Sequence, residues 1–188
     1  MIEWITNLDL AILDFIQNTF RCDFLDTVVP YITSFADKGI GWIAVAVILL
    51  CFKKTRKTGL MVGVALILGL IFGNGLLKNL FARTRPYDLP GVQIDLLVER
   101  LSDFSFPSGH TLASFEAAVV LMIRDKRFGI PALVLAVLIA LTRLYLYVHF
   151  PTDVLAGALL GTLFAFIAVC LVDKVWNKAE LKLAEIKK

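Results

Sequence analysis

The stretch VLAGALLGTLFAFIAVCLV, residues 154–172, contains no charged side chain. A helix needs about 20 apolar residues to cross the hydrocarbon of a bilayer. Residues 58–77 form a second uncharged run, and hydrophobic residues make up 59% of the 188-residue chain. The sequence therefore predicts a polytopic integral membrane protein with an all-α fold, and it argues against a soluble core. Each run also carries a spacing of glycines that allows a neighbouring helix to pack closely, Gly69–Gly73 and Gly157–Gly161.

Shorter segments complete the expected helical bundle. Three of them are apolar enough for helices: residues 40–52, 111–123 and 128–147. Residues 24–35 contain Pro30 and fit a weak span or one half of a bent span. Residues 1–23 are expected to form an amphipathic segment at the membrane interface, with Asp9 among its polar positions. We thus expect about six hydrophobic helices in a single domain that covers residues 1–188.

Basic residues gather in short segments beside the apolar runs. Because positively charged loops stay in the cytoplasm, we expect that side to hold residues 53–57, 124–127 and 174–188. The formal net charge of +3 reflects these segments, so nucleic acid is not an expected partner. The number of membrane crossings between these segments then places six polar residues at the opposite, extracytoplasmic end of the bundle: Lys78, Arg85, His110, Arg143, His149 and Asp153.

The cations of this set predict an anion site. Lys78 and Arg85 are seven residues apart, which on a helix places both on one face, although interfacial anchoring would explain them equally well. Arg143 follows a long uncharged run near membrane depth, where a lone charge usually marks a functional pocket. Phosphate is the natural partner, because arginine offers forked donors and lysine offers a compact charge.

The remaining polar residues suggest chemistry on that anion. Ser108 and Gly109 open a helix whose amides could meet an oxygen, although an ordinary helix cap has the same pattern. His149 and Asp153 are four residues apart, so the carboxylate could orient the imidazole as a nucleophile. The alternative is a capping aspartate beside an interfacial histidine. We expect no metal and no cofactor, because the neighbouring cations would repel a divalent ion.

Together these residues resemble a known family. Lys78-x6-Arg85-Pro86, then Pro107-Ser108-Gly109-His110, then Arg143-x5-His149-x3-Asp153 resembles the three-part signature of the type 2 phosphatidic acid phosphatase (PAP2) superfamily. The resemblance covers residues 58–173, the expected catalytic core, and one departure is Thr142 where the family usually has serine. It implies a metal-independent phosphatase in which His149 becomes phosphorylated, Asp153 orients it and His110 moves protons. It also implies that the phosphate is held by Lys78, Arg85, Ser108, Gly109 and Arg143.

The resemblance further implies a lipid substrate. The small size and the outward-facing site resemble bacterial undecaprenyl pyrophosphate phosphatases, with phosphatidylglycerophosphate and phosphatidic acid phosphatases as alternatives. The implied location is the cell membrane, with several crossings and an extracytoplasmic active site. The sequence does not give the oligomeric state.

Two other classes of protein stay open at this point. A transporter or lipid-binding protein would use the cations without catalysis and would tolerate loss of His149. A purely structural membrane protein would leave the embedded Arg143 unexplained. Two features have no assigned role: Glu116 could face the site or a neighbouring helix, and residues 94–101 could form a lid or an ordinary surface helix.

Overall fold

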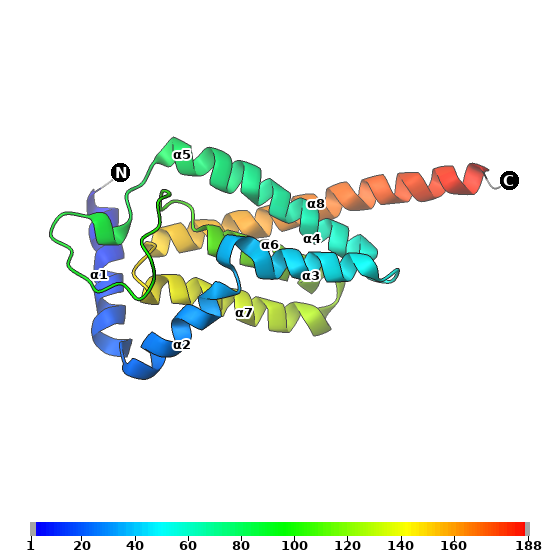
Figure 1. Cartoon of the computed structure of the whole chain (residues 1–188). Helices are drawn as coiled ribbons and strands as arrows, with labels where there is room; N and C mark the ends of the chain where they lie inside the picture. The colour runs from blue at the N-terminus through cyan, green and yellow to red at the C-terminus, as the bar shows by residue number, and fades with distance from the viewer. Residues whose placement is uncertain (1–2, 187–188) are drawn as a thin grey trace.

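The computed structural model describes residues 3–186, and within them every regular element is helical. The α-helices are α1 (Glu3–Phe20), α2 (Asp23–Ser34), α3 (Ile40–Cys51), α4 (Arg56–Leu68), α5 (Lys78–Phe81), α6 (Gly109–Arg124), α7 (Lys126–Tyr145) and α8 (Pro151–Ile186). Three short elements join them: η1 (Asp37–Gly39), the π-helical η2 (Gly69–Leu77) and η3 (Pro86–Asp88). Figure 1 shows the long helices side by side, with α1 lying crosswise at one end.

The helices form a membrane bundle. Four segments of the described chain are long and apolar enough to span a bilayer: Asp23–Cys51, Arg56–Asp88, Lys126–Tyr145 and Pro151–Lys182. Together with α1 and α6, these four segments make six hydrophobic helical segments, which confirms the predicted all-α membrane bundle. Large apolar side chains face outward along these segments, as expected where lipid replaces water: Leu155, Leu159, Leu163 and Phe166 on α8 are examples.

Helix α6 lies at the centre because glycines on both sides let neighbours approach it. A Cβ added at Gly161 would lie 2.5 Å from the Leu112 carbonyl oxygen, and one added at Gly157 would lie 2.8 Å from that of Ser108. Side chains at Gly69 and Gly73 would likewise collide with α6. Both predicted glycine faces therefore pack against the helix that begins at Ser108-Gly109. Glu116 is buried between α6 and η2, so it faces a neighbouring helix.

The loops separate into two ends of the bundle. Figure 1 shows the α3–α4 and α6–α7 connections and the carboxyl end on the side away from α1. The α7–α8 connection and the segment between α5 and α6 lie on the α1 side. The basic segments and the predicted site thus occupy opposite ends, as the charge pattern requires.

Helix α1 turns Asp9 and Leu13 toward the protein. Asp9 is 2% exposed and Leu13 is fully buried, whereas Leu8 is 55% exposed and Phe15 is 61% exposed. The side chain of Gln17 extends this inward contact by donating a hydrogen bond to the Tyr145 carbonyl at 2.6 Å. A helix with this orientation can rest its exposed apolar residues in the membrane interface while Asp9, Leu13 and Gln17 hold it to the bundle.

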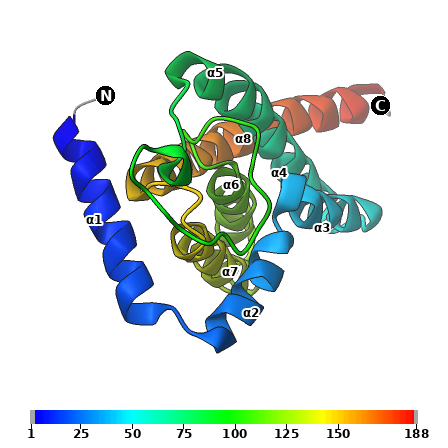
Figure 2. The same cartoon turned by 60° about the vertical axis from the view of Figure 1, so that its left-hand side comes forward.

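The segment between α5 and α6 covers the end of the bundle. Figure 2 shows it crossing in front of α6, between α5 and α7. Tyr87 anchors the segment, since its hydroxyl accepts a hydrogen bond from the Leu101 amide at 3.0 Å. Residues 94–101 are irregular, so the surface helix considered for them is wrong.

The helix that carries Lys78 also ends earlier than the sequence suggested. Helix α5 stops at Phe81, and Ala82 has a left-handed backbone with φ of 43°. The chain is extended at Arg85. The prediction that Lys78 and Arg85 share one helix face is therefore wrong, because a left-handed residue cannot continue a right-handed helix. A different contact brings the two cations together.

Candidate active site

The predicted site residues come from four parts of the chain that meet at the α1 end. Lys78 lies on α5 and Arg85 at the start of η3, Ser108, Gly109 and His110 open α6, Arg143 closes α7, and His149 and Asp153 flank the start of α8. Five of these side chains are nearly inaccessible to solvent: Arg85, Ser108, Arg143, His149 and Asp153. Such concentration of polar groups in a bundle interior is costly unless the groups serve one another or a ligand.

His149 has a different environment at each ring nitrogen. Its Nε2 lies 3.3 Å from Arg85 Nη1, on the side of the cations. Its Nδ1 lies 3.4 Å from the Ser105 hydroxyl and 3.6 Å from Asp153 Oδ2. Burial lowers the pKa of His149 to about 3, and the charges of Arg85 and Arg143 act in the same direction against the bond with Asp153. The imidazole is therefore neutral at ordinary pH, and its Nε2 lone pair faces the Arg85 guanidinium, from which it can accept a hydrogen bond.

Asp153 is held on both of its oxygens, and Arg83 Nη1 donates to Oδ1 at 2.5 Å. The Ser105 hydroxyl donates to Oδ2 at 2.5 Å, and the Phe150 amide donates to the same oxygen at 3.0 Å. Because the direct distance to His149 exceeds a normal hydrogen bond, Ser105 stands between the carboxylate and the ring. A relay from Nδ1 through the hydroxyl to the carboxylate would fix the same tautomer that a direct bond would fix.

Lys78 and Arg85 converge on Asp103, an acid that the sequence analysis did not select. Lys78 Nζ donates to one oxygen of Asp103, and Arg85 Nη2 donates to the other at 2.6 Å. Partial burial disfavours the charged carboxylate, but the bonds and charges of Lys78 and Arg85 hold the pKa of Asp103 at about 2. The side chain is still 53% exposed. A half-exposed carboxylate thus bridges the two cations that were predicted to hold phosphate.

Arg143 keeps unused donors inside the bundle. Its Nη1 donates to the Thr33 hydroxyl on α2 at 2.6 Å, while its Nε finds no partner among the described residues. The charges of Lys78, Arg85 and Arg143 act on one another, which places them in one cluster. A buried guanidinium with an unpaired N–H costs free energy that an anion could recover.

The start of α6 is arranged differently from a helix cap. Within the described chain, the Ser108 side chain makes no capping bond, and its hydroxyl lies 3.0 Å from that of Thr111. Gly109 is the first helical residue, where a free amide can face an anion. His110 Nε2 lies 2.8 Å from Asp37 Oδ1 on η1. The break between α2 and α3 therefore supplies a carboxylate partner for this histidine.

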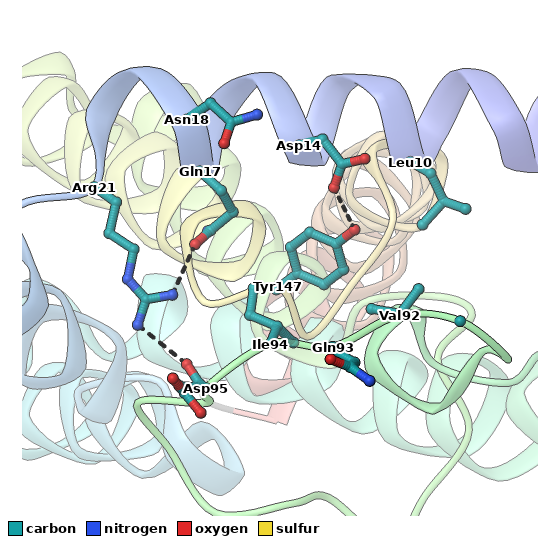
Figure 3. Close-up of a pocket in the computed structure, with 11 residues that line it drawn as sticks. Leu10, Asp14, Gln17, Asn18, Arg21, Val92, Gln93, Ile94, Asp95 and Tyr147 are labelled. Carbon is teal, nitrogen blue, oxygen red and sulfur yellow. Dashed lines mark hydrogen bonds between the residues drawn. The ribbon is translucent and has the colours of Figure 1, made fainter.

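A cavity of about 490 Å³ opens beside this cluster, between α1 and residues 91–95. Figure 3 shows Asp14, Gln17 and Arg21 pointing into it from α1, with the Tyr147 hydroxyl bonded to Asp14. All of the predicted site residues lie in the described chain, and none lines this cavity. The cavity therefore lies outside the predicted site and marks where α1 meets the covering loop.

Sequence reasoning missed four polar residues of the site: Arg83, Asp37, Asp103 and Ser105. Arg83 stood close to a selected arginine, and Asp103 and Ser105 stood just before the Pro107-Ser108-Gly109-His110 motif. Closeness in sequence to the selected residues was the signal that could have identified them. Closeness in sequence does not predict the partner of each side chain, because an irregular backbone has no periodicity.

The fold and the cluster define a helical membrane protein with a buried, neutral imidazole beside a group of cations. Residues 58–177 match the PAP2 superfamily, and the chain belongs to this superfamily. An undecaprenyl-diphosphatase from Sulfolobus acidocaldarius is 36% identical over 129 residues, which cover 68% of this chain and 62% of the relative. The match therefore spans slightly less than two thirds of that relative.

Two solved structures have the same fold. Aquifex aeolicus LpxE has a TM-score of 0.76 and 30% sequence identity, covering 86% of this chain and 94% of that one. The transmembrane PAP2-type phosphatidylglycerolphosphate phosphatase from Bacillus subtilis has a TM-score of 0.73 and 29% identity, covering 92% of this chain and 88% of that one. The predicted superfamily is thus confirmed by sequence and by fold.

Proposed function

We propose that the protein is a membrane lipid phosphatase that transfers the phosphoryl group of its substrate to His149 and then to water. The observation that carries this proposal is the asymmetric environment of the His149 ring. Its Nε2 faces Arg85 and the cations, while its Nδ1 faces Ser105 and Asp153. A neutral histidine oriented in this way can attack a phosphorus atom that the cations hold in place.

The first step forms a phosphohistidine. Lys78, Arg85 and Arg143 bind the phosphoryl oxygens together with Ser108 and the amide of Gly109, and they stabilise the charge that develops on these oxygens. Nε2 of His149 forms a bond to phosphorus as the bond from phosphorus to the lipid oxygen breaks. His110 in its protonated form donates a proton to that leaving oxygen and becomes neutral; Asp37 favours the protonated form, against the burial that lowers the pKa of His110 to about 4.

The second step regenerates the histidine. A water molecule attacks phosphorus and gives a proton to His110, and the bond between phosphorus and nitrogen breaks. Inorganic phosphate leaves, and His149 is neutral again. Throughout both steps Asp153 fixes the tautomer and stabilises the positive charge that forms on the ring.

The substrate that we favour is undecaprenyl diphosphate, which would yield undecaprenyl phosphate. The similarity to the Sulfolobus acidocaldarius diphosphatase supports this choice. The similarity to the Bacillus subtilis enzyme supports phosphatidylglycerophosphate as the alternative, and phosphatidic acid remains a third candidate. We further propose that the site faces the extracytoplasmic side of the cell membrane, because the basic segments lie at the opposite end of the bundle.

Metal removal tests the proposed chemistry. We expect the purified protein to release phosphate from at least one of these three lipids in detergent, and we expect EDTA to leave the rate unchanged. The ranking of the three rates identifies the preferred lipid. Activity that disappears with EDTA and returns with a divalent cation would contradict a metal-independent mechanism. If none of the three lipids releases phosphate over a broad pH range, the proposal that the protein is a phosphatase is itself contradicted.

The carboxylate of Asp103 should compete with the substrate phosphate. Its pKa of about 2 keeps it charged at any working pH, so it repels an incoming anion between Lys78 and Arg85. Asp103→Asn is therefore expected to lower the inhibition constant of inorganic phosphate about tenfold, or ~1.4 kcal/mol. Inhibition kinetics at constant ionic strength measure the effect, with Asp95→Asn in the same loop as the matched control. An unchanged or higher constant would mean that Asp103 organises the cations instead of competing with the ligand.

A further inference from the structure

Arg83 lies two residues before Arg85, yet it binds a separate set of partners. Its Nη1 donates to Asp153 Oδ1 at 2.5 Å and to the Thr152 hydroxyl at 2.7 Å. Its Nη2 donates to Asp9 Oδ2 at 2.8 Å. Both guanidinium termini are thus engaged by carboxylates, and Arg83, Asp9 and Asp153 are all buried. Arg83 therefore serves the carboxylates and leaves phosphate binding to the other cations.

Asp9 also binds the helix that carries Asp153. Its Oδ1 accepts a hydrogen bond from the Thr152 amide at 3.1 Å, and its Oδ2 accepts one from the Thr152 hydroxyl at 2.6 Å. Thr152 is in the first turn of α8, where free amides and the helix dipole favour a negative charge. A carboxylate from α1 thus fixes the start of α8 from outside that helix.

The geometry of Asp153 depends on these contacts. Ser105 and the Phe150 amide bind Oδ2, the oxygen nearest to His149, while Arg83 binds Oδ1. The Arg83 guanidinium also lies 3.8 Å from the centre of the Phe150 ring, which restricts its own position. A planar fork can join two carboxylates in this way, whereas a lysine ammonium cannot reproduce the paired geometry.

We infer that Arg83 is a positioning residue that holds Asp153 in register with the His149 ring, and that Asp9 makes helix α1 a working part of the active site. The inference rests on the proposed phosphatase reaction. Without Arg83, the Asp153 carboxylate can rotate about its remaining contacts, and two buried carboxylates lose their common counter-ion. The reaction then starts from a misaligned nucleophile, while the cations that bind phosphate stay in place.

The test compares Arg83→Gln, Arg83→Lys and Asp9→Asn with the wild type. We expect kcat to fall about 100-fold in Arg83→Gln, as for other small displacements of reacting groups, with KM within about threefold of the wild type. Arg83→Lys should recover part of this loss, and Asp9→Asn should lower kcat about tenfold. The double variant Arg83→Gln/Asp9→Asn should be no slower than Arg83→Gln alone, because both substitutions break the same hydrogen-bond network around Arg83.

Asp14→Asn is the matched control on the same helix. Asp14 accepts a hydrogen bond from the Tyr147 hydroxyl at 2.8 Å (Figure 3), and among the described residues it is not a hydrogen-bond partner of Arg83 or Asp153. The Asp14→Asn substitution therefore weakens the contact of α1 with the bundle and leaves the hydrogen bonds among Arg83, Asp9 and Asp153 intact. We expect the kcat of this variant to stay within about twofold of the wild type. Each rate is expressed per folded molecule, counted by titration with vanadate as an analogue of phosphate.

These measurements separate positioning from a purely structural role. A structural role would reduce the amount of protein that binds vanadate and would leave kcat per binding molecule unchanged. That result, or an equal loss in Asp14→Asn and Asp9→Asn, would overturn the inference. If the wild type releases phosphate and needs His149 while Arg83→Gln keeps full kcat, this inference alone fails. If the wild type releases no phosphate, the proposed function fails and this inference fails with it.

Discussion

Replacing His149 with alanine is expected to lower phosphate release by roughly 1000-fold or more. The reason is that no other described side chain presents a neutral nitrogen beside Arg85 at the centre of the cations. Asp153 and Ser105 would then have no ring to orient, although both would stay in place through their mutual bond. The measurement is initial-rate phosphate release from the best of the three lipids, with EDTA present.

The control for this variant separates chemistry from folding. His149 is buried, so alanine could leave a cavity that destabilises the protein. His149→Gln fills most of that space, and it should be equally inactive while it keeps the melting temperature of the wild type and still binds inorganic phosphate through the cations. Substantial turnover in either variant would contradict the nucleophile assignment, and it would favour a protein that binds lipid phosphates without forming a covalent intermediate.

Arg143→Gln should separate activity from stability. Its guanidinium is buried and its Nε has no partner among residues 3–186, so this charge is a cost to the unliganded protein and a benefit only when an anion is bound. We expect kcat/KM to fall about 100-fold, as it does when other donors to a transition-state oxygen are removed. The melting temperature of the unliganded protein should be equal to that of the wild type or higher.

Arg124→Gln is the matched control, since Arg124 is exposed at the other end of the bundle. It should change neither kcat/KM nor the melting temperature. A lower melting temperature in Arg143→Gln with unchanged kcat/KM would show that Arg143 is a structural residue, held by Thr33 and not by phosphate.

The sequence predicted the helices well because uncharged runs report membrane depth directly. Residues 154–172 lie within α8, and the runs around residues 40–52 and 128–147 correspond closely to α3 and α7. The glycine spacings predicted packing as well, because a missing side chain leaves room for whichever helix is adjacent. Hydropathy and residue volume are local properties, so they can be read from one sequence.

The orientation of side chains in the polar regions was harder to predict. Asp9 was assigned to a polar face, but the sequence does not say that this face turns inward when lipid lies outside. Lys78 and Arg85 were expected to meet through helix periodicity. They meet through Asp103 instead, because Ala82 ends the helix and the chain between α5 and α6 folds back.

Arg83 shows the same limit at the level of one residue. Arg83 and Arg85 are two positions apart and have the same chemistry, yet one binds Asp153 and the other lies beside His149. The distinction depends on the irregular backbone after Ala82 and on a carboxylate from α1. Neither contact leaves a regular spacing in the sequence.

The most direct test of the account is to look for phosphate on His149. The protein is mixed with lipid diphosphate labelled with ³²P in its terminal phosphate and is quenched in alkali within one turnover. We predict label on the wild-type protein that withstands alkali, is released by acid, and is absent from His149→Ala. Turnover of the wild type with no labelled protein at any quench time, or with label that persists in His149→Ala, would contradict transfer through this histidine.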